Sequence, residues 1–233
     1  MRWRMALAVA VMAGLLLPGS GLAQDARPGI AVLPFEDGGS YGQDKEDFQA
    51  LTVGLQQMLI TEFAANTGLR VVDRGRVNEL LAEQDLGASG RVDANTAARI
   101  GKVVGARYMV MGGFVDFYGD MRVDIRIVNT ETTEVVKVER RRDDRAKLFT
   151  MVVDLADGIT KGLRLPALSG DLLQQRQDRS ERIDQEAVRL YTKALLYADR
   201  GDHEKAVELF NQVTTRFPDY TEAHEALRQI QGS

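Results

Sequence analysis

Residues 106–128 read ARYMVMGGFVDFYGDMRVDIRIV, and this stretch decides the fold. Its first half is apolar on both faces, which is typical of a central strand covered on two sides. A turn at Tyr118-Gly119-Asp120 leads directly into a second strand, in which charged and apolar residues alternate. The alternating residues are Arg122, Val123, Asp124, Ile125, Arg126 and Ile127. This pattern predicts a half-buried antiparallel strand with one face in water.

A strand-helix-strand unit precedes this stretch. Residues 29–35 (GIAVLPF) form a short apolar run, which predicts a buried strand. From Asp47 onward apolar residues recur three and four positions apart, which predicts an amphipathic helix that stops at Gly68. Residues 69–72 predict a second strand. The unit is most simply a right-handed parallel crossover.

The other predicted elements complete one domain. Short helices are expected after Asp73 and after a cap at Asp93 or Asn95, and residues 135–139 predict the third strand of a meander. Residues 140–145 (RRRDDR) read as a surface turn that could recognise an acidic partner, and a helix follows as far as Pro166. The predicted fold class is mixed α and β, with a mixed sheet flanked by helices over residues 24–165.

The N-terminus predicts a secretory signal peptide over residues 1–23. Arg2 and Arg4 precede an apolar run at 5–17, and small residues precede a cleavage point after Ala23. A membrane anchor is the alternative, but the run is shorter than the roughly 20 residues that a spanning helix needs. The predicted location is therefore the periplasm, with peripheral association with the outer membrane left open. No transmembrane helix is expected after cleavage.

Composition excludes several classes of function. A formal charge of −4 offers no basic surplus for binding nucleic acid, and the absence of cysteine excludes thiol catalysis, disulfides and a lipidated cysteine. The two histidines, His203 and His224, are expected at the surface. No phosphate-binding glycine motif and no paired nucleophile and base are present, so we expect no cofactor, no metal and no enzymatic activity.

The C-terminal region predicts a helical repeat. Residues 166–186 are expected to be a linker or a solvated helix, and residues 187–233 have the spacing of one tetratricopeptide repeat with a capping helix. The residues that match the repeat are Ala194, Tyr197, Gly201, Ala206, Phe210 and Pro218. An ordinary helical hairpin is the alternative. A single repeat exposes a flank, so it should pack on the first domain, on a second copy or on a partner.

Three aromatic residues are the expected contacts of a protein partner in the groove of this repeat. They are Tyr197, Phe210 and Tyr220, of which Phe210 is the one expected to belong to the core. This assignment rests on the repeat pattern, because single repeats present their helices to a ligand or to a neighbouring repeat.

Several sequence blocks in residues 29–160 resemble the CsgG family of curli-secretion and related envelope proteins. The blocks include IAVLPFED, the helix with GLQQMLITEF, VVDRGRVNELL, GARYMVMGGFV and IRIVNTETTEVV. The resemblance implies a fold similar to the N-terminal domain of TolB. Pore-forming members are lipoproteins with additional long β-hairpins, and this chain has neither a cysteine to lipidate nor a spare hairpin.

The expected function is that of a non-catalytic periplasmic adaptor that binds envelope or secretion proteins through the repeat. The alternative is a subunit of an oligomeric outer-membrane secretion channel or ring, in which the chain would form a homo-oligomer. A third hypothesis is a small-ligand sensor that uses Glu36 and Asp37 at the end of the first strand, although a solvated loop explains these residues as well.

Overall fold

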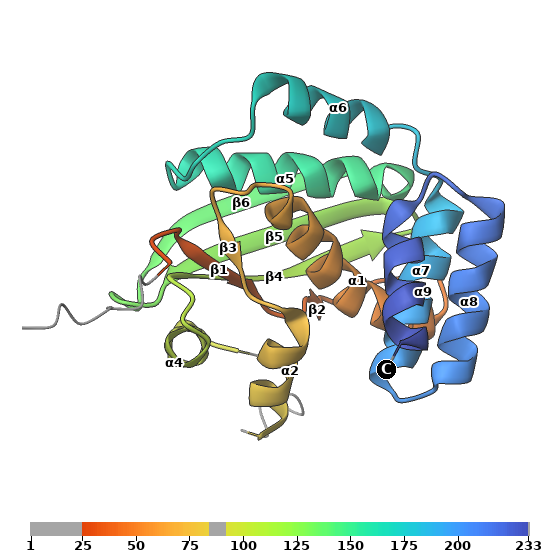
Figure 1. Cartoon of the computed structure of the whole chain (residues 1–233), viewed down its shortest axis with the longest axis horizontal. Coiled ribbons are helices and arrows are strands. Elements are labelled where there is room, and N and C mark those ends of the chain that lie inside the picture. Colours follow the sequence, from red (N-terminus) through yellow and green to blue (C-terminus); the bar gives the residue numbers. More distant parts are fainter. Residues whose placement is uncertain (1–24, 84–91, 233) are drawn as a thin grey trace, which may run out of the picture.

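A mixed sheet forms the centre of the molecule in a computed structural model, which describes residues 25–83 and 92–232 (Figure 1). The strand order is β3-β1-β4-β5-β6, and the short β2 pairs with β4. The strands are β1 (Gly29–Val32), β2 (Glu36–Asp37), β3 (Arg70–Val71), β4 (Tyr108–Phe117), β5 (Asp120–Asn129) and β6 (Val135–Asp144). The predicted signal peptide lies outside the described residues.

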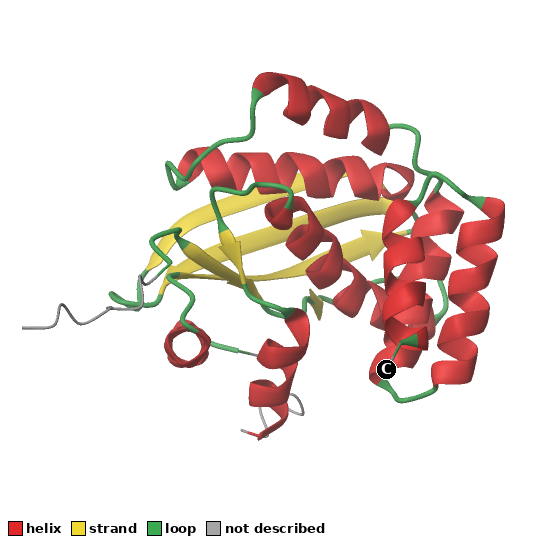
Figure 2. Cartoon of the chain, viewed as in Figure 1, coloured by secondary structure: helices red, strands yellow, loops and turns green. Residues whose placement is uncertain are grey.

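Helices cover this sheet unequally (Figure 2). Helices α1 (Lys45–Ala64) and α5 (Leu148–Gly162) pack on one face, and α2 (Arg74–Glu83) and α4 (Ala94–Val104) pack on the other. The second pair lies over β1 and β4 and leaves most of the same face of β5 and β6 without a helix. The covered face of β5 carries the predicted apolar residues, and Val123, Ile125 and Ile127 are all fully buried.

The strand pairing agrees with the crossover and the meander. β1 pairs in parallel with both β3 and β4, so that α1 connects two parallel neighbours. β4 and β5 pair antiparallel along their whole length, with Tyr108 opposite Asn129 and Phe117 opposite Asp120. At the N-terminus of α4 the side chain of Asp93 accepts a hydrogen bond from the Thr96 amide, so Asp93 is the cap and Asn95 is not.

Two expectations need correction. The meander strand β6 continues to Asp144, so residues 140–144 are part of a strand and do not form a surface turn. A short helical turn, η1 (Arg145–Lys147), then leads into α5.

The second correction concerns residues 36–37, which form the short strand β2. In the loop that follows it, the Asp37 carboxylate accepts hydrogen bonds from Ser40 and Gly39 within its own turn.

Four helices follow the sheet domain. They are α6 (Gly170–Ser180), α7 (Gln185–Asp199), α8 (His203–Arg216) and α9 (Thr221–Gln231). The segment after Pro166 is therefore mainly a helix, and α7 packs along α1 beside the sheet domain (Figure 1). Gly201 turns the chain between α7 and α8 with a φ of 78°, a conformation that glycine adopts readily. Within the described residues, no helix has the length and apolar character to span a membrane.

Candidate protein-interaction surfaces

The outer part of the sheet presents a face that none of the described helices covers, which we call the open face. It is built by β4, β5 and β6, whose alternate side chains point away from α1 and α5. Its residues are Val115, Phe117, Arg122, Asp124, Arg126, Val136, Val138, Arg140 and Arg142. Val138 is 56% exposed and Phe117 is 53% exposed.

Arginine dominates the charge of the open face. Arg140 lies opposite Asp124 on the neighbouring strand and forms an ion pair with it, and Arg122 lies 2.7 Å from the same carboxylate. Arg142 hydrogen-bonds Asp120 with an Nε to Oδ1 distance of 2.8 Å, which lowers the pKa of that aspartate. The open face therefore carries a positive excess on a chain whose formal charge is −4.

Arg126 is the arginine of the open face that forms no ion pair with any described residue. It is exposed and lies opposite Val138 in the strand register. β6 is also the edge of the sheet, and β5 is the one strand it pairs with in the described chain. An edge strand offers backbone donors and acceptors to another chain, so this surface combines unpaired backbone, exposed apolar groups and positive charge.

A second surface, between α1 and α7, is closed and tightly packed. Gly54 of α1 faces Thr192 of α7, and a β-carbon at Gly54 would lie 2.2 Å from the Thr192 methyl group. A residue larger than glycine cannot occupy this position unless the helices move apart. The absence of a side chain at Gly54 therefore allows α7 to lie directly on the sheet domain.

Charged groups extend the α1–α7 contact. Lys193 lies 2.7 Å from Asp47, and the Tyr197 hydroxyl donates a hydrogen bond to Glu46. That hydrogen bond is the main reason why the pKa of Glu46 is lowered. Lys205 of α8 in turn donates to the Tyr197 oxygen. The contacts of Lys193 and Tyr197 with α1 join residues that lie about 150 positions apart in the sequence, and they fix how α7 is placed on α1.

The three aromatic residues expected to bind a partner are buried in this structure. Phe210 and Tyr220 are each 1% exposed and Tyr197 is 7% exposed. Tyr197 bonds to the sheet domain, whereas Phe210 packs against the ring of Tyr191 and Tyr220 packs between Tyr191 and Phe149. Their role in binding a partner stays a prediction. In the chain as it stands, they hold the helices together.

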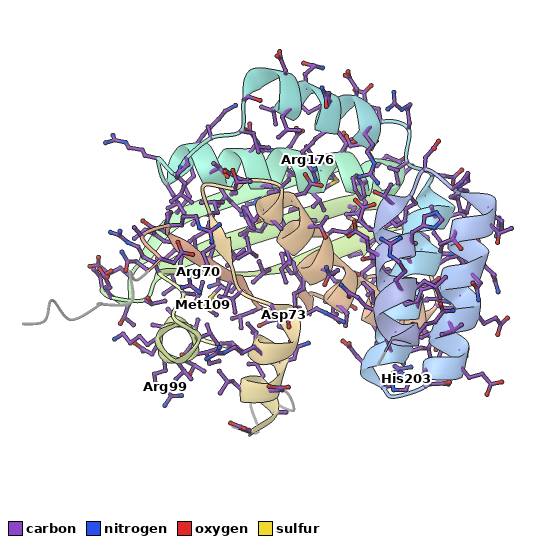
Figure 3. The ribbon with its side chains drawn as sticks, viewed as in Figure 1. Arg70, Asp73, Arg99, Met109, Arg176 and His203 are labelled. Carbon is purple, nitrogen blue, oxygen red and sulfur yellow. The ribbon has the colours of Figure 1, made fainter. Side chains whose placement is uncertain are left out.

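Helix α6 is held across α1 and α9 by two ion pairs. Arg176 makes two hydrogen bonds of 2.6 Å to Glu62 of α1, and Figure 3 shows Arg176 between α6 and α5. Arg179 binds Glu222 of α9 at 2.7 Å. Burial opposes ionisation of Glu222, but the hydrogen bonds and charge of Arg179 outweigh it and lower the pKa of Glu222. The region expected to be a linker or a solvated helix thus fastens the C-terminal helices to the sheet domain.

The described residues contain no group of three or more His, Asp or Glu side chains that could hold a metal ion. Asp143 and Asp144 lie at the end of β6, where Asp143 pairs with Lys147 and Asp144 caps the following turn.

Gly112 of β4 is in close contact with Phe35 and the β5 backbone, so this glycine permits tight packing within the sheet. His203 and His224 lie on α8 and α9, with His203 at the far end of the helical hairpin (Figure 3).

A mixed sheet with helices on both sides and an attached set of helices defines the class of this protein as α/β with an α-helical extension. Residues 21–120 match the model of a family described as curli production assembly/transport component CsgG. This match supports the CsgG family for that part of the chain, which includes β1 to β4 and the α2 and α4 layer. No curated protein matches the chain.

Several solved structures are similar at low sequence identity. TolB from Acinetobacter baumannii is 14% identical with a TM-score of 0.41, and the similarity covers 60% of this chain and 29% of that chain. The C-terminal domain of LpoB from Salmonella enterica is 16% identical with a TM-score of 0.37, over 52% of this chain and 86% of that chain. A PelC dodecamer from Paraburkholderia phytofirmans is 13% identical with a TM-score of 0.36, over 62% and 91% respectively.

Proposed function

We propose that this protein is a non-catalytic adaptor of a cell-envelope assembly and that it acts in the periplasm by binding other proteins. The family model matched by residues 21–120 carries a description of assembly and transport, which supports a role of this kind. In this proposal residues 1–23 are a signal peptide, and α7 and α8 are one tetratricopeptide repeat capped by α9.

The observation that carries the proposal is the open face. Exposed Val136 and Val138 lie beside arginines on the edge strand β6, and exposed Phe117 lies at the end of β4. Such a surface suits an acidic partner that adds a strand or a helix. The C-terminal helices lie on the side of the sheet opposite to the open face. They pack on α1 and leave the open face accessible on the sheet's other side.

The proposal is tested by site-specific crosslinking in cells with the complete chain. A photo-crosslinking amino acid is placed at Val138 of the open face, and at exposed Ala82 of α2 as the control. We expect Val138 to capture envelope proteins that Ala82 does not, and we expect Arg126→Glu to weaken that capture. Equal products from both positions, or none from Val138, would contradict the proposal. Deleting residues 166–233 is a poor test, because it would uncover the face of α1 that α7 covers.

A second candidate function is supported by the free edge of β6. Its sequence from Arg140 to Asp144 places arginines beside aspartates, and a second copy could match this pattern in an antiparallel pair. Such a two-fold contact joins two copies, and an oligomeric outer-membrane ring or channel would need a head-to-tail contact in addition. Light scattering of the purified protein with and without detergent distinguishes the two. A ring gives a discrete mass of several chains, and crosslinks from Val138 then join copies of the chain itself.

A further inference from the structure

A cavity of about 310 Å³ lies where α1, α2, α7 and α9 meet, away from the open face. Residues from all four helices line it, including Thr61 of α1, Tyr191 of α7 and Glu225 of α9, while Asp73 lines it from the residue before α2. Figure 3 shows Asp73 at the start of α2, on the side toward the C-terminal helices. The volume is in the range of small-molecule sites, and none of the interactions proposed above uses it.

Tyr191 is the unusual group in this cavity. The residue is 2% exposed, yet its hydroxyl forms no hydrogen bond with any described residue. Its ring is held by Phe210 and Tyr220 at centroid distances of 5.9 and 5.0 Å, so the side chain has a fixed position. Because Tyr191 lines the cavity, its hydroxyl is not fully enclosed by protein and can form a hydrogen bond with a bound ligand.

The charges around the Tyr191 hydroxyl favour a positive ligand. Arg74 lines the cavity but is paired with Asp199 at 2.8 Å, and Glu222 is paired with Arg179. Glu225 forms no ion pair with a described residue, and it lines the same cavity. Burial, followed by the charge of Glu222, raises the pKa of the Tyr191 hydroxyl. The charge of Arg74 opposes this rise and that of Glu225 adds to it, and the hydroxyl stays protonated.

A further carboxylate and several neutral polar groups complete the wall of the cavity. One carboxylate oxygen of Asp73 accepts a hydrogen bond from the Gly75 amide at 2.8 Å, and the negative charge of Asp73 is favourable at the N-terminus of α2. The second carboxylate oxygen remains as an acceptor. The Gln57 side-chain amide donates a hydrogen bond to the Thr61 hydroxyl at 3.4 Å, which leaves the side-chain oxygen of Gln57 as a neutral acceptor. A ligand with N–H donors and a positive charge would match the carboxylates of Glu225 and Asp73.

We infer that this cavity binds a small organic cation, with an alkylammonium or guanidinium nitrogen between Glu225 and the Tyr191 hydroxyl. The hydroxyl accepts an N–H from the cation, and Glu225 supplies the opposing charge. Apolar contacts with Ile60, Leu195 and Ala226 fit the methylene chain of such a ligand. Because the cavity is formed by both the sheet domain and the C-terminal helices, binding would stabilise their association.

The test is an NMR titration of the complete isotope-labelled protein with cadaverine and agmatine. Pentanol and glutarate serve as neutral and anionic probes of similar length. We expect both cations, and neither control compound, to shift the amide signals of residues that line the cavity. Glu225→Gln and Tyr191→Phe should each weaken binding by about three- to fivefold. Glu204→Gln is the matched control, since it removes an exposed glutamate of α8 that does not line the cavity.

Three results would overturn the inference. The first is the absence of localised shifts with either cation, and the second is stronger binding of glutarate or pentanol at the same residues. The third is equal affinity of the Glu225→Gln and Glu204→Gln variants for cadaverine. Each variant is compared with the original protein by circular dichroism, and Glu225→Gln keeps the test valid if Tyr191→Phe fails to fold, because Glu225 is exposed.

Discussion

The helical layer, which consists of α6 to α9 packed beside α1, and the open face of the sheet are both rich in charged residues. The ion pairs that hold α6 in the helical layer are largely buried, whereas those on the open face are exposed. In the helical layer, the Glu62 side chain is 4% exposed and meets a single arginine in a two-bonded ion pair. On the open face, the side chains of Arg140 and Arg142 are 63% and 68% exposed. A buried charge without its partner is costly, so a buried ion pair fixes the geometry of the groups that it joins. An exposed arginine loses little free energy when a partner protein replaces its contacts.

The largest expected effect comes from breaking a buried pair. Arg176→Met leaves the Glu62 carboxylate buried without its partner, so we expect the free energy of unfolding to fall by about 3 kcal/mol. Urea denaturation measures this change. Arg142→Met on the open face is the matched control and should leave the urea midpoint nearly unchanged. The double variant Glu62→Gln with Arg176→Met should recover most of the lost stability. Equal losses in Arg176→Met and Arg142→Met would contradict the difference between the buried and the exposed ion pairs.

A methyl group at the α1–α7 contact should have the next largest effect. Gly54→Ala places a β-carbon against Thr192, which forces the helices apart and costs about 1–3 kcal/mol. Gly170→Ala in α6 is the control, because a β-carbon there meets no other atom within 4 Å. Alanine favours helices over glycine, so the control should gain up to about 1 kcal/mol. Thermal unfolding of the two variants should therefore shift in opposite directions, and a shift in the same direction would show that α7 does not lie on α1 in this way.

A smaller effect is expected from pH. The pKa of Glu222 is lower in the folded chain than its ordinary value of 4.5, so its contribution to stability is present above that value. The contribution is lost as the pH falls below about 4.5 and through the folded pKa, because the unfolded chain then binds the proton more readily. In urea denaturation, the stability difference between the original protein and Glu222→Gln should be constant from about pH 7 to 5.5 and shrink below about 4.5. A difference that grows with acid would contradict the assignment.

The smallest effect on stability is expected on the open face. Arg126→Gln removes an exposed charge that has no ion-pair partner among the described residues, so unfolding should change by no more than about 0.5 kcal/mol. The same variant should reduce capture by the crosslinker at Val138, and the reduction should diminish at high salt. A large loss of stability would mean that Arg126 supports the fold and is not free for a partner.

Much of the sheet domain follows from local patterns. The alternation at Val123, Ile125 and Ile127 predicted which face of β5 is buried, and it placed Arg122 and Arg126 on the other face. The extension of β6 through residues 140–144 was missed, because a run of arginines and aspartates has no apolar alternation. Pairing with β5 orders that run, since Arg140 and Arg142 lie opposite Asp124 and Arg122 in the register.

Local sequence patterns did not predict the closed surfaces, because the residues that meet there lie far apart in the sequence. Gly54 is visible in the sequence as a glycine within a helix, but its partner Thr192 lies in an element far along the chain. The ion pair of Glu62 with Arg176 is equally distant in sequence. For the same reason the repeat pattern identified Tyr197 and Tyr220 as residues of interest, while the structure placed both in the packing between helices.

The sequence by itself determined the order of the elements, the buried side of β5 and the helical nature of the C-terminal region, because hydrophobic periodicity is a local property. The tertiary structure alone decided that α7 lies on α1, that β6 is a long free edge and that α1, α2, α7 and α9 enclose a cavity around Tyr191. These features depend on which surfaces meet, and that choice is made by packing and by ion pairs between residues far apart in the chain.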